Sequence, residues 1–375
     1  MKKLSILFVY VLLVLVVGCT GQQVTTEVLF KKGDAGIHTY RIPALIQAKD
    51  GSIVVFAEAR HNSGSDTGDI DLVARRSVDG GRTWGDIITV WDDGENVCGN
   101  PSPVVDMETG RIILLSTWNN GKDGEKAIHE RKSIDTRRIF VIYSDDNGQT
   151  WSEAKEITES VKDPEWTWYA TGPCHAIQLK SEPHKGRIVV PCNHGIFGKG
   201  TVSHVIYSDD KGETWHIGGS PDTGNESTVT ELSNGDIMLN MRGQRGKDRA
   251  DYGYARLVAL SHDGGVTFDA PFYDTALVEP VCNASIMNYA RKGSLTETLL
   301  FSNPADSLKR KNMTVKMSND SGKTWHPVTN FGPLPAAYSD IIVLDNGDVA
   351  LFYETGENTS YDTMTFVLLP SKMFN

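Results

Sequence analysis

SVDGGRTW (residues 77–84) is the stretch that decides the fold, because its pattern returns four more times along the chain. The further copies are SDDNGQTW (144–151), SDDKGETW (208–215), SHDGGVTF (261–268) and SNDSGKTW (318–325). Every copy, which we call an Asp box, has Asp third, Gly fifth and a large aromatic residue last, and follows an apolar run. The carboxylate can accept hydrogen bonds from its own turn, Gly supplies a positive φ, and the ring can pack on an apolar layer. Each Asp box therefore predicts a strand that enters a stapled turn.

The Asp boxes recur about every sixty residues, and the interval varies from one box to the next. A loose period filled with short strands is typical of a β-propeller, in which each repeat is a four-stranded blade that buries its faces against its neighbours. A solenoid would usually keep a tighter period. The chain has room for about six blades, the last without a box. The sequence thus predicts an all-β, six-bladed β-propeller.

The beginning of the chain has the pattern of an export signal. Lys2 and Lys3 precede an apolar run over residues 4–17, which is shorter than the about 20 residues of a membrane span, and Gly18 and Cys19 follow. The ending VVGC resembles a lipoprotein signal, in which the Cys becomes the lipidated N-terminus. We expect a signal over 1–18, a tether over 19–30 and one propeller domain over 31–375. The protein would be exported, with Cys19 either a lipid anchor or, after ordinary cleavage, a bystander.

Charge and cysteine spacing restrict the partners. The formal net charge is −11 at pH 7, which argues against nucleic acid or an anionic membrane as a partner, so any membrane contact would come through the lipid. The other cysteines (Cys98, Cys174, Cys192 and Cys282) lack metal-ligand spacing, and we expect neither a metal nor a cofactor. Buried thiols and disulfides both stay open.

Arginines stand in distinctive settings near the start of the predicted domain. Arg41 lies in HTYRIPALIQ (38–47), and FAEARHNSGSD (56–66) follows it with Arg60 and Asp66. A YRIP motif together with repeated Asp boxes resembles the exo-sialidases of bacteria and animals. The resemblance extends from about residue 39 to residue 369, and it implies a propeller that removes terminal sialic acids from glycoconjugates.

The resemblance also implies a role for eight residues. They are the carboxylate-binding clamp Arg41, Arg242 and Arg310, the sugar-contacting Arg60, the acid/base Asp66, the general base Glu226, the nucleophile Tyr338, and Glu354, which holds Arg41. Two alternatives stay open. Glu231 lies close to Glu226, and Lys309 could exchange roles with Arg310.

The chemistry explains these residue types. A sialoside carries a carboxylate on its anomeric carbon, and arginine binds carboxylates with a planar, permanently charged fork. The substrate would repel a carboxylate nucleophile but not a neutral phenol, and sialidases with a Tyr nucleophile are a known exception among glycosidases. We expect a retaining exo-α-sialidase. A trans-sialidase with the same residues and a non-catalytic Asp-box propeller that binds glycans or proteins are the alternatives.

The sequence departs from the family pattern in a few places. Cys174 and Ala176 stand where glycines are expected, and residues 192–194 (Cys-Asn-His) replace residues that contact the glycerol side chain of the sugar. Trp118 is either a wall of the site or loop packing. The charged segment 122–138 is expected to be a solvated excursion between strands.

Overall fold

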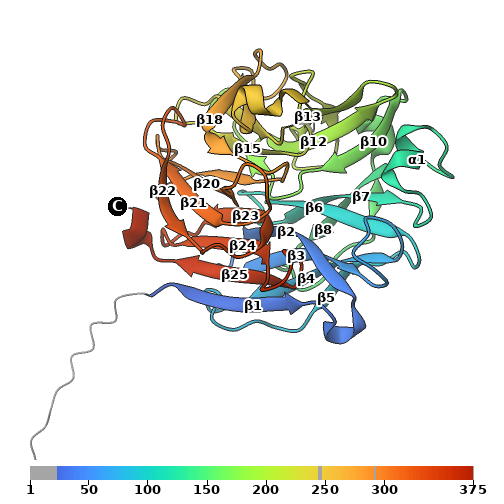
Figure 1. The fold of residues 1–375 in the computed structure, drawn as a ribbon, viewed down its shortest axis with the longest axis horizontal. Helices are drawn as coiled ribbons and strands as arrows, with labels where there is room; N and C mark the ends of the chain where they lie inside the picture. The colour runs from blue at the N-terminus through green and yellow to red at the C-terminus, as the bar shows by residue number, and fades with distance from the viewer. Residues whose placement is uncertain (1–22, 244–246, 291–292, 375) are drawn as a thin grey trace, which may run out of the picture.

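The computed structural model describes residues 23–243, 247–290 and 293–374. The predicted signal and Cys19 lie outside this part of the chain. Figure 1 shows short strands arranged in sheets around the molecule, with the blue N-terminal strand beside the red C-terminal ones. Within the described residues, no helix combines the length and the apolar character that crossing a membrane requires.

The strands form one large sheet and four smaller ones. The large sheet contains β2 (Thr39–Gln47), β3 (Ile53–Arg60), β4 (Ile70–Ser77), β5 (Ile88–Trp91), β6 (Val97–Val105), β7 (Ile112–Asn119), β8 (Arg138–Ser144) and β9 (Lys155–Glu156). The next contains β10 (Trp166–Thr171), β11 (Ile177–Gln178), β12 (Ile188–Ile196), β13 (Gly200–Ser208) and β14 (His216–Ile217). Then come β15 (Ser227–Glu231), β16 (Ile237–Met241), β17 (Ala255–Ser261) and β18 (Phe272–Val278). The fourth contains β19 (Ser285–Asn288), β20 (Leu299–Pro304), β21 (Met313–Ser318) and β22 (His326–Asn330). The last contains β23 (Ala336–Val343), β24 (Val349–Thr355), β25 (Thr363–Leu369) and β1 (Thr25–Lys31). The helical segments are α1 (Glu125–His129), α2 (Thr158–Val161), η1 (Asp34–Gly36), η2 (Lys247–Tyr252) and η3 (Ser371–Phe374).

Hydrogen bonding divides the described strands into five sheets, whereas the sequence predicted six blades. The difference arises in the eight-stranded sheet, where one parallel pair, Ile70 with Val97, joins β4 to β6. All other strand pairs in that sheet are antiparallel. The architecture is all-β and propeller-like.

Strand β1 corrects the predicted tether of residues 19–30. This strand pairs antiparallel with β25, so the N-terminal segment completes the sheet formed by the end of the chain. Leu29 and Phe30 are buried, and the Phe30 ring lies 5.0 Å from that of Tyr40. Residues 25–30 are therefore part of the fold, because their apolar side chains and backbone groups both find partners there.

The Asp boxes lie where the sequence predicted them, at the turn between the third and fourth strands of a repeat. In the box after β8, Asp146 accepts hydrogen bonds from the backbone of Gln149 and Thr150 and from the Thr150 hydroxyl. The Ser144 hydroxyl donates to Asp146 and accepts from the backbone of Gly148, whose φ is 84°. The local sequence thus builds a complete turn from its own side chains.

The aromatic residue of an Asp box joins neighbouring repeats. The Trp84 ring packs edge-on against Phe366 of β25, with ring centroids 4.9 Å apart. Trp151 packs in the same way on Phe56 of β3, at 5.5 Å. Such a pair contributes about 0.5–1.5 kcal/mol beyond its buried area. The boxes therefore fix the strand ends and also the contact between neighbouring repeats.

Replacing Asp146 with Ala should lower the free energy of unfolding by about 1–2 kcal/mol, because four hydrogen-bond donors lose their acceptor. Chemical denaturation measures this change. The matched control is Glu153→Ala, an exposed acid three residues beyond Thr150. An equal loss in both variants would show that the box carboxylate has no special role.

The four described cysteines, Cys98, Cys174, Cys192 and Cys282, are buried free thiols. The sequence left open whether these cysteines are buried thiols or form disulfides, and the structure shows buried thiols. Burial raises the pKa of Cys192 to about 12, so this thiol stays protonated at neutral pH.

Candidate active site

One cavity of about 520 Å³ gathers most of the predicted functional residues. Seven of the eight line it: Arg41, Arg60, Asp66, Glu226, Arg242, Arg310 and Tyr338. They come from strands and loops of four different sheets, so only the closed arrangement of sheets brings them together. No residue of an Asp box is among the described residues that line this cavity.

Glu354 lies behind Arg41 and holds it. Arg41 on β2 donates through Nε and Nη2 to the two oxygens of Glu354, at 3.0 and 3.3 Å. Glu354 also accepts from the backbone amides of Ile42, at 2.9 Å, and of Tyr338, at 3.1 Å. Ile42 has φ of 62°, a strained value for a β-branched residue, and the strand register shifts there. The buried carboxylate thus fixes the guanidinium and the irregular backbone beside it.

The hydroxyl of Tyr338 on β23 lies between the carboxylate of Glu226 and the guanidinium of Arg242. It donates to Glu226 at 2.6 Å and accepts from Arg242 Nη1 at 2.8 Å, and Arg242 also pairs with Glu226. Burial raises the pKa of Tyr338 well above its usual range, a shift that Arg242 opposes and Glu226 reinforces. The phenol is therefore neutral at rest, with a carboxylate in place to take its proton.

The structure distinguishes Arg310 from Lys309. Arg310 points into the cavity, where Nη1 donates to the Tyr361 hydroxyl at 2.8 Å and Nη2 to the Val281 carbonyl at 2.9 Å. Lys309 is exposed and does not line the cavity. Arg41 and Arg310 both lie over the Tyr338 ring, at 5.2 and 5.3 Å from its centroid. Of the two candidates for the third arginine-clamp position, Arg310 is therefore the one whose side chain lies in the cavity.

Glu226 and Glu231 are distinguished in the same way. Glu226 lines the cavity and contacts Tyr338, whereas Glu231 at the end of β15 is buried away from it. Both oxygens of Glu231 accept backbone amides, those of Lys180 at 2.7 Å and Ser181 at 2.9 Å. Glu231 is a structural carboxylate that holds a chain reversal.

Asp66 lies on the loop between β3 and β4 and lines the cavity, with a side chain that is 64% exposed. Its Oδ1 lies 2.7 Å from Arg60 Nη1 and 3.6 Å from Arg41 Nη1. Desolvation would raise the pKa of Asp66, but Arg60 and Arg41 outweigh it and lower the pKa below the usual value. Asp66 is therefore ionised at neutral pH in the free protein.

Arg60 is more enclosed than expected of a sugar-contacting residue. Its Nε and Nη2 donate to Glu58, and Nη1 donates to the carbonyls of Gly64 and Ser65 in addition to pairing with Asp66. All three nitrogens thus have protein partners. Arg60 therefore holds the loop that carries Asp66 in place. This positioning role is separate from any contact that Arg60 makes with a ligand.

Several further cavity residues were given no role by the sequence analysis. They include Glu58, Asn100, Arg137, Trp168 and Tyr361. Arg137 corrects the prediction of a solvated excursion over 122–138, because its side chain is only 2% exposed and lies 3.9 Å over the Trp168 ring. Burial lowers the pKa of Arg137 to about 10. No pattern within the charged segment 122–138 indicates that the side chain of Arg137 is buried in the cavity wall.

The departures from the family pattern have a structural counterpart. Cys174 has φ of 124°, a value that favours glycine, and Gly172 before it has φ of 57°. Asn193 lines the cavity, while His194 is buried and stacks on Trp166 with centroids 3.5 Å apart. Trp118 does not line the cavity, and its Nε1 donates a hydrogen bond to Asp93 at 2.6 Å. Of the two roles considered for Trp118, a wall of the site or loop packing, the structure therefore shows loop packing.

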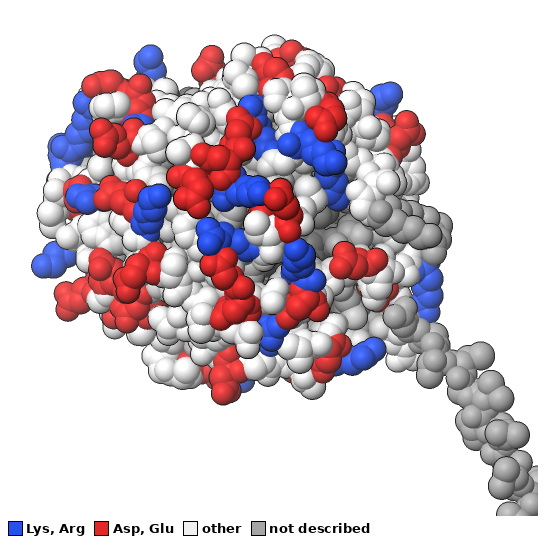
Figure 2. All heavy atoms as spheres, turned by 180° about the vertical axis from the view of Figure 1, so that it is seen from behind, with Lys and Arg blue, Asp and Glu red and all other residues white. Residues whose placement is uncertain are grey.

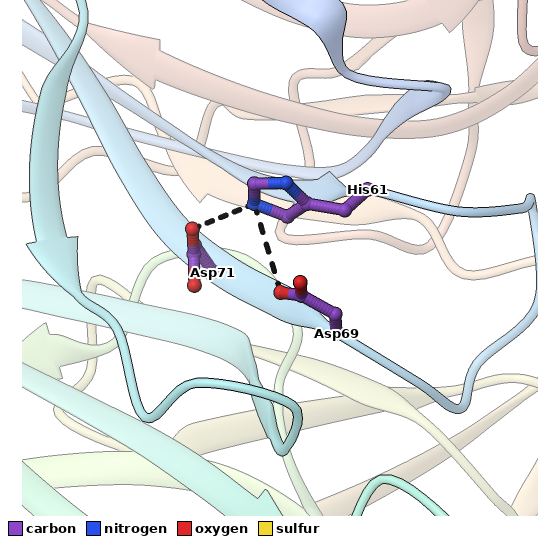
Figure 3. A group of neighbouring side chains, drawn as sticks. All are labelled: His61, Asp69 and Asp71. Carbon is purple, nitrogen blue, oxygen red and sulfur yellow. Dashed lines mark hydrogen bonds and ion pairs between the residues drawn. The ribbon is translucent and has the colours of Figure 1, made fainter.

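A group of side chains with metal-ligating atoms lies at the base of the Asp66 loop. Figure 3 shows His61 pointing toward Asp71 and Asp69, with Nε2 2.7 and 3.7 Å from their carboxylates. The three ligand atoms lie within 4.8 Å of one another. Sequence spacing alone did not single out this group. Its hydrogen bond between His61 and Asp71 already closes the loop without an ion.

Prolonged dialysis against EDTA should leave the sialoside hydrolysis that the resemblance implies unchanged, because every group in the cavity that we assign to the chemistry is a protein side chain. The measurement is kcat/KM before and after dialysis, with a buffer-dialysed sample as the control. A loss that calcium or another divalent cation restores would place an ion at the His61 group.

The face drawn in Figure 2 carries acidic and basic side chains in alternation. Ion pairs among the charged side chains of the described residues include Arg111 with Asp145 and Arg187 with Asp209. This distribution accords with the net charge of −11 and offers a polyanion no continuous basic stripe on that face.

Known proteins similar to this chain are BNR-repeat proteins and sialidases. The chain matches the BNR repeat-like domain over residues 34–351. It is 34% identical over 349 residues to a sialidase of Micromonospora viridifaciens, covering 90% of this chain and 53% of that protein. It is 30% identical over 304 residues to an exo-alpha-sialidase of Aspergillus fumigatus, covering 76% of this chain and 69% of that protein. The structure of the Hadza microbial sialidase Hz136 superposes with a TM-score of 0.78 and 30% identity, over 91% of this chain and 67% of that chain.

The fold and the cavity thus define a propeller-like protein of BNR repeats with an arginine-rich site. The chain belongs to the sialidase family. It spans about half the length of its Micromonospora relative, 53%, and 61% of a Bacteroides fragilis sialidase.

Proposed function

We propose that the chain is an exo-α-sialidase that hydrolyses terminal sialic acids from glycoproteins, glycolipids and oligosaccharides. The observation that carries this proposal is the Tyr338 hydroxyl, held between Glu226 and Arg242 in a cavity that also contains Arg41 and Arg310. Three guanidiniums suit a ligand whose carboxylate lies next to the reacting carbon. The sialidase relatives support the same activity.

In the first step the Tyr338 oxygen would bond to the anomeric carbon as the bond to the leaving oxygen breaks. Glu226 takes the phenolic proton, and Asp66 gives its proton to the leaving oxygen. In the second step water attacks the same carbon and gives a proton to Asp66, and the released phenolate recovers its proton from Glu226. Two displacements at one carbon retain its configuration.

Asp66 needs a proton for the first step, although Arg60 and Arg41 lower its pKa in the free protein. A sialoside carboxylate bound at Arg41 would offset part of that positive charge and raise the pKa of Asp66. Substrate binding would therefore prepare the acid, and an empty site would keep it ionised.

A fluorogenic aryl sialoside tests the proposal. We expect release of the aryl alcohol together with free sialic acid. Aryl alcohol without free sialic acid would mean that the glycosyl-enzyme passes to another acceptor, as in a trans-sialidase. No release at all would favour the non-catalytic binding propeller.

We infer that the propeller has six blades. The support is that β2–β5 and β6–β9 each repeat the strand–strand–strand–box–strand order, and a single bridge, Ile70 with Val97, joins them. Counting them separately gives six units, with β1 as the outer strand of the unit formed by β23–β25. Amide hydrogen exchange should protect the backbone amides of β2–β5 and those of β6–β9 as two separate groups.

We also propose export and lipid attachment at Cys19, on the sequence of residues 1–19 alone. Labelled palmitate should be incorporated into the protein in a bacterial host and lost in Cys19→Ser. Incorporation that survives the substitution would contradict the anchor.

A further inference from the structure

Asn100 is held on nearly all sides at the edge of the cavity. It has φ of 54°, in the left-handed region that asparagine tolerates, and the register of β6 shifts beside it. Its backbone amide donates to Glu58 Oε1 at 2.9 Å, and its carbonyl accepts from the Thr171 hydroxyl at 2.6 Å. The backbone of this residue is therefore fixed from two sheets.

Arg137 fixes the side chain of Asn100 as well. Arg137 Nη2 donates to Asn100 Oδ1 at 2.5 Å and to the Thr117 hydroxyl at 2.8 Å. The central carbon of the Arg137 guanidinium in turn lies 3.9 Å from the centroid of the Trp168 ring. A guanidinium can only donate, so the amide atom that faces it must be the oxygen, which removes the ambiguity between the two ends of the amide.

The consequence is a single outward-facing donor. With Oδ1 bound to Arg137, the Nδ2 group of Asn100 lies at the other end of the amide, and no described residue accepts a hydrogen bond from it. Asn100 lines the cavity with a residual exposure of 8%. A ligand group at this point must accept a hydrogen bond, because an N–H that a ligand leaves unpaired in a closed site is costly.

We propose that Arg137 is a positioning residue that sets Asn100 as a donor for an uncharged oxygen acceptor of the sialoside, and that this contact selects among sialic acids. The proposal rests on the proposed sialidase function. The acceptor is either the carbonyl of the N-acyl group or the 4-hydroxyl oxygen, which share this chemistry.

Asn100→Asp tests the contact with almost no change of shape. The carboxylate still pairs with Arg137, and aspartate tolerates the same φ, but the atom that faces the cavity becomes an acceptor. The substrates are aryl glycosides of N-acetylneuraminic acid, of its 5-amino analogue and of its 4-deoxy analogue. Because the leaving group is the same, ratios of kcat/KM cancel any change in the pKa of Asp66.

We expect the parent to prefer the N-acetyl substrate, and Asn100→Asp to reduce its preference over one analogue by about tenfold, the size of one hydrogen bond. The affected analogue identifies the acceptor. Asn319→Asp is the matched control, because it makes the same change at an exposed Asp-box position where two other boxes have Asp. The control should leave every ratio unchanged.

A double-mutant cycle tests the positioning role. Arg137→Lys keeps the charge but loses the planar fork, and it should reduce the same ratio in the parent and have no further effect in an Asn100→Ala background. Thermal unfolding checks that each variant folds, and Asn100→Asp decides the contact even if Arg137→Lys does not fold.

Unchanged ratios in Asn100→Asp from an active parent would overturn the inference alone. An effect of Arg137→Lys that persists without Asn100 would overturn the positioning role. A parent that releases no aryl alcohol would overturn the proposed function and this inference with it.

Discussion

Replacing Tyr338 with Phe is expected to reduce kcat by about a thousandfold or more on every sialoside, because the variant loses the atom that forms the glycosyl-enzyme. The three arginines remain, and the pair of Arg242 with Glu226 survives the loss of the hydroxyl. The affinity for an unreactive sialic-acid analogue should therefore change far less than kcat. Steady-state kinetics and calorimetric titration measure the two effects.

The matched control is Tyr353→Phe, which removes a hydroxyl from another buried tyrosine outside the cavity walls. This variant should keep its activity. A fluorosialoside trap should also leave a covalent adduct on the peptide that contains Tyr338, visible by mass spectrometry. An adduct on another residue would refute the assigned nucleophile and leave the sialidase activity standing.

Replacing Asp66 with Ala should have an effect that depends on the leaving group. Natural sialosides need a proton on the departing oxygen, and we expect kcat to fall by about 10²- to 10⁴-fold for them. Activated aryl sialosides leave with little protonation and should lose much less. Parallel assays on sialyllactose and an aryl sialoside measure the difference, and equal losses on both would contradict the role of general acid.

The pH dependence gives a second measure of Asp66. A lowered pKa in the free protein means that the protonated acid becomes scarcer as pH rises above it. For natural sialosides, kcat/KM of the parent should therefore fall as the pH rises above this lowered pKa, and the fall should begin in the acidic range. Asp66→Ala should flatten this limb, and Asp66→Asn, which keeps the shape without a titrating proton, should do the same.

Arg60 shows how the structure changes the meaning of a correctly placed residue. Sequence pattern put it near the sugar, and the structure puts it in the cavity wall, but its nitrogens are bound to Glu58, the Asp66 loop and Asp66 itself. A motif identifies which residue comes near a site. It does not identify which partners the side chain contacts, because those lie on other segments of the chain.

Arg137 marks the limit of local pattern more clearly. Its neighbours in the sequence are charged, which normally indicates a solvated loop, and nothing within a few residues predicts the Trp168 ring that buries it. Strand β1 is a similar case. Its role as the outer strand of the sheet that β25 closes depends on pairing across nearly the whole chain.

The sequence by itself determined the repeated stapled turns, the all-β architecture and the residue types of the site. An Asp box is complete within eight residues, so its turn is short-range chemistry that can be predicted from the residues alone. Only the tertiary structure decided between Glu226 and Glu231 and between Arg310 and Lys309. Those choices depend on which side chains converge from distant strands, as Arg41 and Glu354 do across 313 residues. Such convergence is fixed by sheet packing and strand register, which no local segment contains.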